Sequence, residues 1–265
     1  MKNKLQSFET YRGFAALMIA AVHFDVNSPL SNHSLANGLF VHFFFTLSGF
    51  VMYLNYHNKF IDFNSVKNFL KKRFFRLYPL HFLFLIIFLI IEIIKYLLQI
   101  KFGLEANNLA FSINNFKTFL GNIFLIQTFF DVNTFNTPSW SISAEYYTYM
   151  IFALVFFFMK KNNLLIFISL LGILTFRLNS EIGLGVERTY LSFLDCVYCF
   201  FIGIFSCKIY FKYSNLEIYK KYYSIITLIL LIVSCLLIIN IGGKFSFIIP
   251  LFFGLLLIFS ANLKN

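Results

Sequence analysis

Arg12 and His23 are the first residues of this sequence whose types and spacing could do chemistry. The stretch from 12 to 27 is otherwise mostly apolar. Eleven residues of α-helix advance about 16.5 Å and turn through about 1,100°, three turns plus about 20°, so both side chains would lie on one face. An ionisable side chain inside a hydrocarbon layer usually faces a protein-lined or water-filled cavity. We expect Arg12 at the mouth of such a cavity and His23 inside it; the alternative is a histidine hydrogen-bonded to a backbone carbonyl.

The segment KKRFFRLYP carries Arg73, Arg76 and Pro79 at intervals of three. As a helix it would place the two guanidinium groups on one side. Pro79 would be tolerated in the first turn of the membrane span that we expect to follow. Paired arginines at a helix entry can hold phosphate groups through bidentate hydrogen bonds. The alternative is a basic anchor on the cytoplasmic side of the membrane.

The segment NTPSWSISAEYYTYM places a carboxylate inside another apolar stretch. Thr137 and Pro138 predict a helix start, and Ser141, Glu145 and Tyr149 then follow at intervals of four along one face. Within a membrane a carboxylate needs an arginine, a histidine or water as its partner. Glu145 is therefore a candidate site residue, and a structural ion pair is the alternative.

Small and buried polar residues complete the set. Ser48 and Gly49, in FFFTLSGF, offer either a close helix contact or room for a ligand. Asp195 lies in the middle of a predicted span without an assigned role. We interpret the four cysteines as packing residues and expect no metal site, since only two of them have ligand-like spacing: Cys196, Cys199, Cys207 and Cys235.

The composition requires that these residues be positioned by membrane helices. Of the 265 residues, 59% are hydrophobic and 12% charged, and 40 are phenylalanines; the mean hydropathy is +0.77. This predicts an all-α, polytopic integral membrane protein, with residues 1–265 as one membrane domain. We expect eight spans, at about 12–27, 38–56, 77–98, 141–159, 163–178, 190–208, 222–240 and 245–261.

The sidedness depends on residues 117–130, which are apolar but short for a span. If this segment does not cross, 16 of the 22 Lys and Arg residues fall on the cytoplasmic side, and if it crosses only 12 do. We therefore expect both termini in the cytoplasm and residues 117–130 to be re-entrant or to lie in the outer interface. Basic loops next to anionic lipid explain the net charge of +11 without a nucleic-acid partner.

Four motifs in this order resemble membrane-bound acyltransferase family 3, the bacterial surface-polysaccharide O-acyltransferases: Arg12 to His23, FFFTLSGF, RFFRLYP and PSWSISAEYYTY. The resemblance implies an acyl-CoA donor, usually acetyl-CoA, used from the cytoplasm. It also implies a saccharide hydroxyl as acceptor and a place in the inner or plasma membrane, with no cofactor besides the donor substrate. His42 stands where family members often carry aspartate. Family members usually have about ten spans, so we expect this chain to lack the last helices.

Together the motifs and the resemblance predict a mechanism. His23 would act as general base, since imidazole has an ordinary pKa of about 6.5, and Glu145 would orient it or bind the sugar. Ser48 or Ser141 would polarise the thioester carbonyl. Basic side chains would bind the phosphates of coenzyme A: Arg12, Lys72, Arg73 and Arg76. The alternatives are a transporter or flippase of a lipid-linked sugar, with His and Glu relaying protons, and a truncated, non-catalytic family member.

Overall fold

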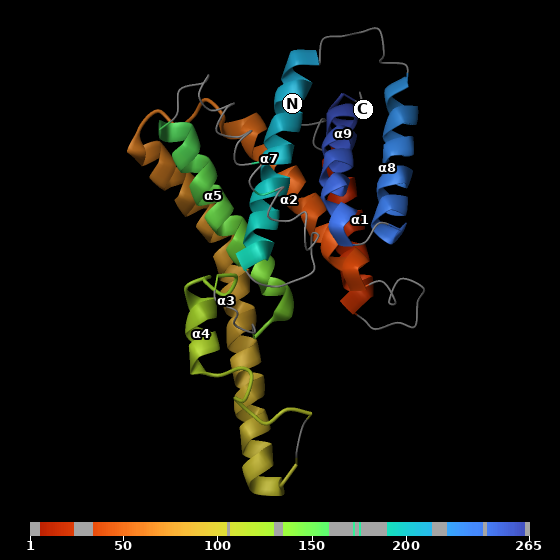
Figure 1. The fold of residues 1–265 in the computed structure, drawn as a ribbon. Helices are drawn as coiled ribbons and strands as arrows, with labels where there is room; N and C mark the ends of the chain where they lie inside the picture. The colour runs from red at the N-terminus through yellow and green to blue at the C-terminus, as the bar shows by residue number, and fades with distance from the viewer. Residues whose placement is uncertain are drawn as a thin grey trace. The chain divides into compact units, whose positions relative to one another are not determined.

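The computed structural model describes residues 6–23, 34–104, 107–129, 135–158, 172, 175, 190–213, 222–240 and 243–262. Within these ranges every regular element is a helix (Figure 1). In the described part of the chain, four helices are long and apolar enough to cross a bilayer: Leu39–Tyr56, Phe63–Phe102, Trp140–Phe158 and Leu191–Tyr213. Two shorter apolar helices cover Tyr223–Ile239 and Ser246–Ala261.

The described residues therefore form a helical membrane protein, as the composition predicts. The count of eight spans stays a prediction beyond the four long apolar helices. The predicted span at 163–178 lies outside the described residues, apart from 172 and 175.

Contacts divide the chain into two compact units. The first unit comprises Met1–Lys59, Met159–Glu187 and Leu194–Asn265, and the second comprises Phe60–Phe158 and Arg188–Phe193. The assignment of the whole chain to one domain stays a prediction.

The first unit packs apolar helices against one another, with contacts of α1 with α2, of α2 with α9 and of α8 with α9. Aromatic rings fill these contacts: the Phe8 and Phe50 centroids lie 5.5 Å apart, and those of Phe43 and Phe253 lie 5.3 Å apart. Its described helices are α1 (Gln6–His23), α2 (Ser34–Tyr56), most of α7 (Tyr190–Tyr213), α8 (Tyr223–Asn240), the short 3-10 helix η4 (Gly243–Ile248) and α9 (Ile249–Ala261).

Two glycines allow α2 and α7 to approach closely. A Cβ added to Gly49 would lie 1.9 Å from the carbonyl oxygen of Phe200, and one added to Gly203 would lie 1.9 Å from that of Thr46. No side chain larger than hydrogen fits at such distances, so the backbones themselves are in contact. Of the two interpretations of Gly49, the structure supports helix packing.

The second unit is built on α3 (Phe63–Phe102), a helix of 40 residues. A capping box starts it: the Ser65 amide donates to the Asp62 carboxylate at 2.8 Å, and the Ser65 hydroxyl accepts from the Asp62 amide at 3.3 Å. Gly103, with φ of 61°, ends it in the left-handed region. Pro79 lies inside this helix, so the prediction that it falls in a first turn is wrong. The cap at Asp62 begins the helix several turns earlier, and the helix tolerates the proline with loss of one backbone hydrogen bond.

Two other helices flank different halves of α3 (Figure 1). α5 (Trp140–Phe158) runs antiparallel to the N-terminal half, where Phe63 lies 6.4 Å from Phe157 and Phe74 lies 5.8 Å from Tyr146 between ring centroids. α4 (Phe116–Ile123) lies along the C-terminal half. Its eight residues span only about 12 Å, so it cannot cross the bilayer as a helix. This agrees with the prediction that residues 117–130 do not form a full span.

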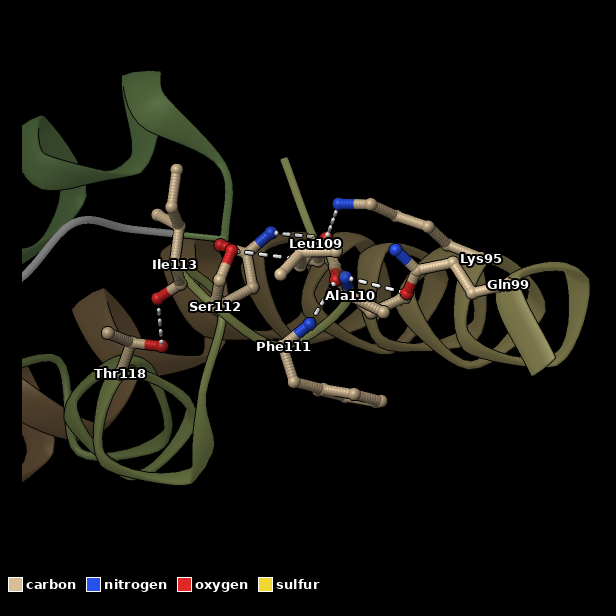
Figure 2. Close-up of polar contacts among 10 residues, drawn as sticks. Lys95, Gln99, Leu109, Ala110, Phe111, Ser112, Ile113 and Thr118 are labelled. Carbon is tan, nitrogen blue, oxygen red and sulfur yellow. Dashed lines mark hydrogen bonds and ion pairs between the residues drawn. The ribbon is translucent and has the colours of Figure 1, made fainter. Parts of the chain in front are cut away.

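The C-terminal half of α3 carries a polar stripe, defined by His81, Glu92 and Gln99. Intervals of eleven and seven residues place these three on one face. The segment after α3 returns along this stripe and hydrogen-bonds to each of its three residues. His81 Nε2 lies 2.9 Å from the Asn122 carbonyl oxygen. The Ala110 amide donates to the Gln99 side chain at 3.0 Å (Figure 2).

Glu92 is the centre of the polar stripe. It is buried and accepts hydrogen bonds from the Phe111 amide and from the Asn114 side chain, both at 2.9 Å, while Lys95 lies 3.5 Å away. Polar groups within a bilayer depend on the protein itself for hydrogen-bond partners, and the return segment supplies a partner to each residue of the stripe. The other faces of this half expose large apolar side chains, among them Ile87, Ile90, Ile91, Ile94 and Leu97.

Candidate functional site

Glu145 and Tyr149 form the acidic part of the candidate site, on α5. The 3-10 turn Thr137–Ser139 leads directly into α5, as the sequence predicts for a helix start. One turn separates Glu145 from Tyr149, and the Tyr149 hydroxyl donates to the Glu145 carboxylate at 2.5 Å. Ser141 lies one turn before Glu145, where its hydroxyl donates to the Pro138 carbonyl oxygen at 2.9 Å. The four-residue spacing thus becomes a real contact between the acid and the tyrosine.

Arg73 supplies the cationic part of the site from the neighbouring helix. Its side chain is buried, with 9% of the residue exposed. The guanidinium carbon lies 5.5 Å from the ring centroid of Phe69 and 5.9 Å from that of Tyr149, both within cation–π range. Tyr149 therefore contacts the arginine through its ring and the glutamate through its hydroxyl. The arrangement can stabilise a negative charge beside a proton donor.

The basic residues around Arg73 differ in exposure. Lys72 and Arg76 are exposed, whereas Arg73 turns toward α5. The structure thus separates the two arginines that the spacing placed together: one is a buried part of the α3–α5 contact, and the other is available at the surface of its unit. Two exposed cations next to a buried one suit an anionic ligand that binds at the surface of α3.

The remaining predicted site residues lie in the first unit. α1 contains both Arg12 and His23 in one continuous helix, as predicted. Arg12 forms an ion pair with Glu9, one turn earlier. The side chain of His23 lies outside the described part of the structure. Ser48 is buried on α2, next to the close glycine contact with α7.

His42 and Asp195 are the pair that the sequence analysis did not join. Both were noted, but 153 positions separate them. The structure places His42 Nε2 3.4 Å from Asp195 Oδ2, with side chains 0% and 3% exposed. The available signal was that each is a lone ionisable residue within an apolar span, so that each needs a partner. Glu92, also missed, carried the same signal in the third span.

Among the described residues no group of three or more His, Cys, Asp or Glu residues could hold a metal ion. Cys196, Cys199 and Cys207 are buried, and none of the four cysteines is in a disulfide.

These features define a helical membrane protein with charged and polar side chains held between its apolar helices. Over residues 5–265 the chain matches the family described as acyltransferase domain, and it belongs to acyltransferase family 3. This confirms the family that the four motifs predict. The chain is therefore a helical membrane protein of an acyltransferase family.

A curated relative supports this assignment. The chain is 31% identical over 171 residues to a protein named acyltransferase MdmB from Streptomyces mycarofaciens. The match covers 60% of this chain but only 41% of that relative. No solved structure matches this chain significantly.

Proposed function

We propose that this protein transfers an acyl group, most simply acetyl, from cytoplasmic acyl-CoA to a hydroxyl group of a cell-surface or lipid-linked saccharide. The observation that carries the proposal is the joint contact of Arg73 and Glu145 with Tyr149, next to the exposed Lys72 and Arg76. A site of this kind combines anion binding with a hydrogen-bonding carboxylate, and both are needed for a phosphate-bearing donor and a hydroxyl acceptor.

The donor is held by its phosphates. Coenzyme A carries several phosphate charges, and arginine binds phosphate through two parallel hydrogen bonds. Lys72 and Arg76 are exposed on α3, and Arg12 is available once a phosphate competes with Glu9 for its guanidinium. Arg73 is buried against Phe69 and Tyr149, so its positive charge attracts the phosphates without direct contact.

The transfer is direct in this proposal. His23 takes the proton from the acceptor hydroxyl as its oxygen attacks the thioester carbonyl carbon. The new C–O bond forms, the C–S bond breaks, and the proton passes from His23 to the departing thiolate, so that free CoA and the ester are the products. Glu145 hydrogen-bonds the sugar or orients the imidazole, and Ser48 or Ser141 donates a hydrogen bond to the carbonyl oxygen.

The proposal places the protein in the inner or plasma membrane with its N-terminus in the cytoplasm. Membrane lipids surround it, and neither a metal, a redox cofactor nor nucleic acid takes part. Cysteine labelling tests the orientation: introduced cysteines near residues 65, 161 and 215 should react from the cytoplasmic side. Labelling of 161 and 215 from outside would mean that residues 117–130 cross after all, and the eight-span topology would be wrong.

The test of function is thioester turnover by the purified full chain in detergent or in proteoliposomes. We expect release of free CoA from acetyl-CoA that increases with a saccharide acceptor, and transfer of labelled acetyl to that acceptor. A Glu145→Gln variant serves as the matched control and should lose acceptor-dependent release. Movement of a lipid-linked sugar across vesicles without thioester cleavage would indicate a flippase instead. Failure to bind any acyl-CoA by calorimetry would indicate a non-catalytic family member.

A further inference from the structure

His42 and Asp195 form a buried polar pair inside the contact between two apolar helices. The imidazole of His42 packs edge-on against Phe45, with centroids 5.9 Å apart. Asp195 precedes Cys196 and Cys199, both fully buried on the same helix. The pair therefore lies deep in the contact between α2 and α7, away from any exposed surface of this unit.

Burial makes this pair expensive compared with an apolar one. Removing a carboxylate and an imidazole from water costs several kcal/mol, and well-packed hydrophobic residues of similar volume are often as stabilising. Breaking such a pair by removing one partner is strongly destabilising, because it leaves a buried polar group unmatched. A buried polar pair can also select one alignment of two helices, because other alignments leave its members unmatched.

Several neighbouring contacts between α2 and α7 depend on this alignment. One turn after His42, the Thr46 hydroxyl donates to the His42 carbonyl oxygen at 2.9 Å and lies within reach of the Cys199 thiol. The Thr46 carbonyl faces Gly203, and Gly49 faces the Phe200 carbonyl. A shift of α2 by one residue along α7 would separate the polar pair and would also move backbone atoms into each other at both glycines.

We propose that His42 and Asp195 are positioning residues for acyl transfer: they lock the alignment of α2 on α7 and thereby fix the place of the Ser48 hydroxyl between Thr46 and Gly49. This inference rests on the proposed function, in which Ser48 is a candidate to polarise the thioester carbonyl. The alignment itself does not depend on that function and has a separate readout.

The first experiment measures alignment without turnover. In a background with the other cysteines replaced (Cys196→Ala, Cys207→Ala and Cys235→Ala), Thr46→Cys should form a disulfide with the native Cys199 under mild oxidation in membranes. Adding Asp195→Leu should slow this cross-link, and the exchanged pair His42→Asp with Asp195→His should restore it. A cross-link that forms equally fast in all three proteins would show that the pair does not fix the alignment of α2 on α7.

The second experiment measures turnover in chains with native cysteines. The double variant His42→Leu/Asp195→Leu should keep a parent-like melting temperature and parent-like acetyl-CoA binding while kcat falls about 10- to 100-fold. The exchanged pair should recover most of kcat, which a loss of general packing would not allow. A double-leucine protein with parent kcat would show that the pair only fills space. If the parent protein itself has no turnover, the proposed function fails. The cross-linking result alone then decides whether His42 and Asp195 fix the alignment of α2 on α7.

Discussion

The Tyr149 hydroxyl donates a hydrogen bond to the Glu145 carboxylate one turn earlier in α5, while the Arg73 guanidinium of α3 lies over the ring of the same tyrosine. Tyr149 thus connects the acid and the buried guanidinium cation of the candidate site. Its two contacts use different parts of one side chain, so substitutions can remove them separately.

Tyr149→Phe removes the hydroxyl and keeps the ring beneath Arg73. A hydrogen bond to a charged group contributes about 1.5–3 kcal/mol, so we expect kcat to fall about tenfold or more while KM for acyl-CoA stays within about twofold. Tyr146→Phe is the matched control, because Tyr146 packs on Phe74 through its ring and should retain parent kinetics without its hydroxyl. Equal kinetics for the Tyr149→Phe variant and the parent would remove this hydrogen bond from the mechanism.

The two arginines of α3 differ in burial, so their substitutions should have different effects on stability. Arg76→Ala should leave the melting temperature unchanged and raise KM for acyl-CoA about tenfold, since one charge-assisted phosphate contact is lost at an exposed position. Arg73→Ala should raise KM and also lower the melting temperature, because its guanidinium packs on two aromatic rings. Arg12→Ala should behave like Arg76→Ala. The KM for acyl-CoA is measured from initial rates over a range of donor concentrations, and the melting temperature from thermal unfolding. An Arg76→Ala protein with unchanged KM would show that the donor phosphates do not bind at Arg76.

His23→Ala tests the base. A general base contributes about 10²- to 10⁴-fold, so kcat should fall by that factor with little change in acetyl-CoA binding. The readouts are single-turnover rates and donor binding by calorimetry, with a melting curve to exclude misfolding. A folded variant that binds donor and turns over near the parent rate would make Glu145 the next candidate.

Gly49→Ala tests the close approach of α2 and α7. The added Cβ would overlap a backbone carbonyl oxygen, which cannot move as a flexible side chain can. We expect a loss of about 3 kcal/mol or failure to fold, measured by thermal unfolding in detergent. Gly13→Ala is the control on α1, because nothing lies within 4 Å of a Cβ there. It should be neutral or stabilise by about 0.5–1 kcal/mol.

Glu92→Leu tests how the return segment is held on α3. The variant loses the acceptors of the Phe111 amide and the Asn114 side chain. Phe111 has φ of 59°, a backbone conformation that a bulky residue adopts only when its surroundings impose it. We expect a lower melting temperature and faster labelling of a cysteine introduced at Ser112. Glu92→Gln should be milder, since its amide oxygen still accepts one bond. Ile91→Leu, at an exposed neighbouring position, should match the parent.

The sequence by itself determined the features that depend on composition and on spacing within one segment. Apolar content required membrane helices, four-residue spacing put Glu145 next to Tyr149, and the shortness of the apolar stretch at 117–130 left α4 unable to cross. Such relations follow from helix geometry alone, because residues three or four apart are neighbours in any α-helix.

Only the tertiary structure decided which helices pack together and which of their residues lie opposite one another. It turned Arg73 toward Tyr149, although the spacing grouped it with Arg76, and it carried α3 through Pro79 because the cap lies at Asp62. It also joined His42 to Asp195 across 153 positions. An apolar helix can pack on many partners at similar energy, so its sequence does not name them; the partner is selected by close backbone contacts and buried polar groups contributed by distant segments.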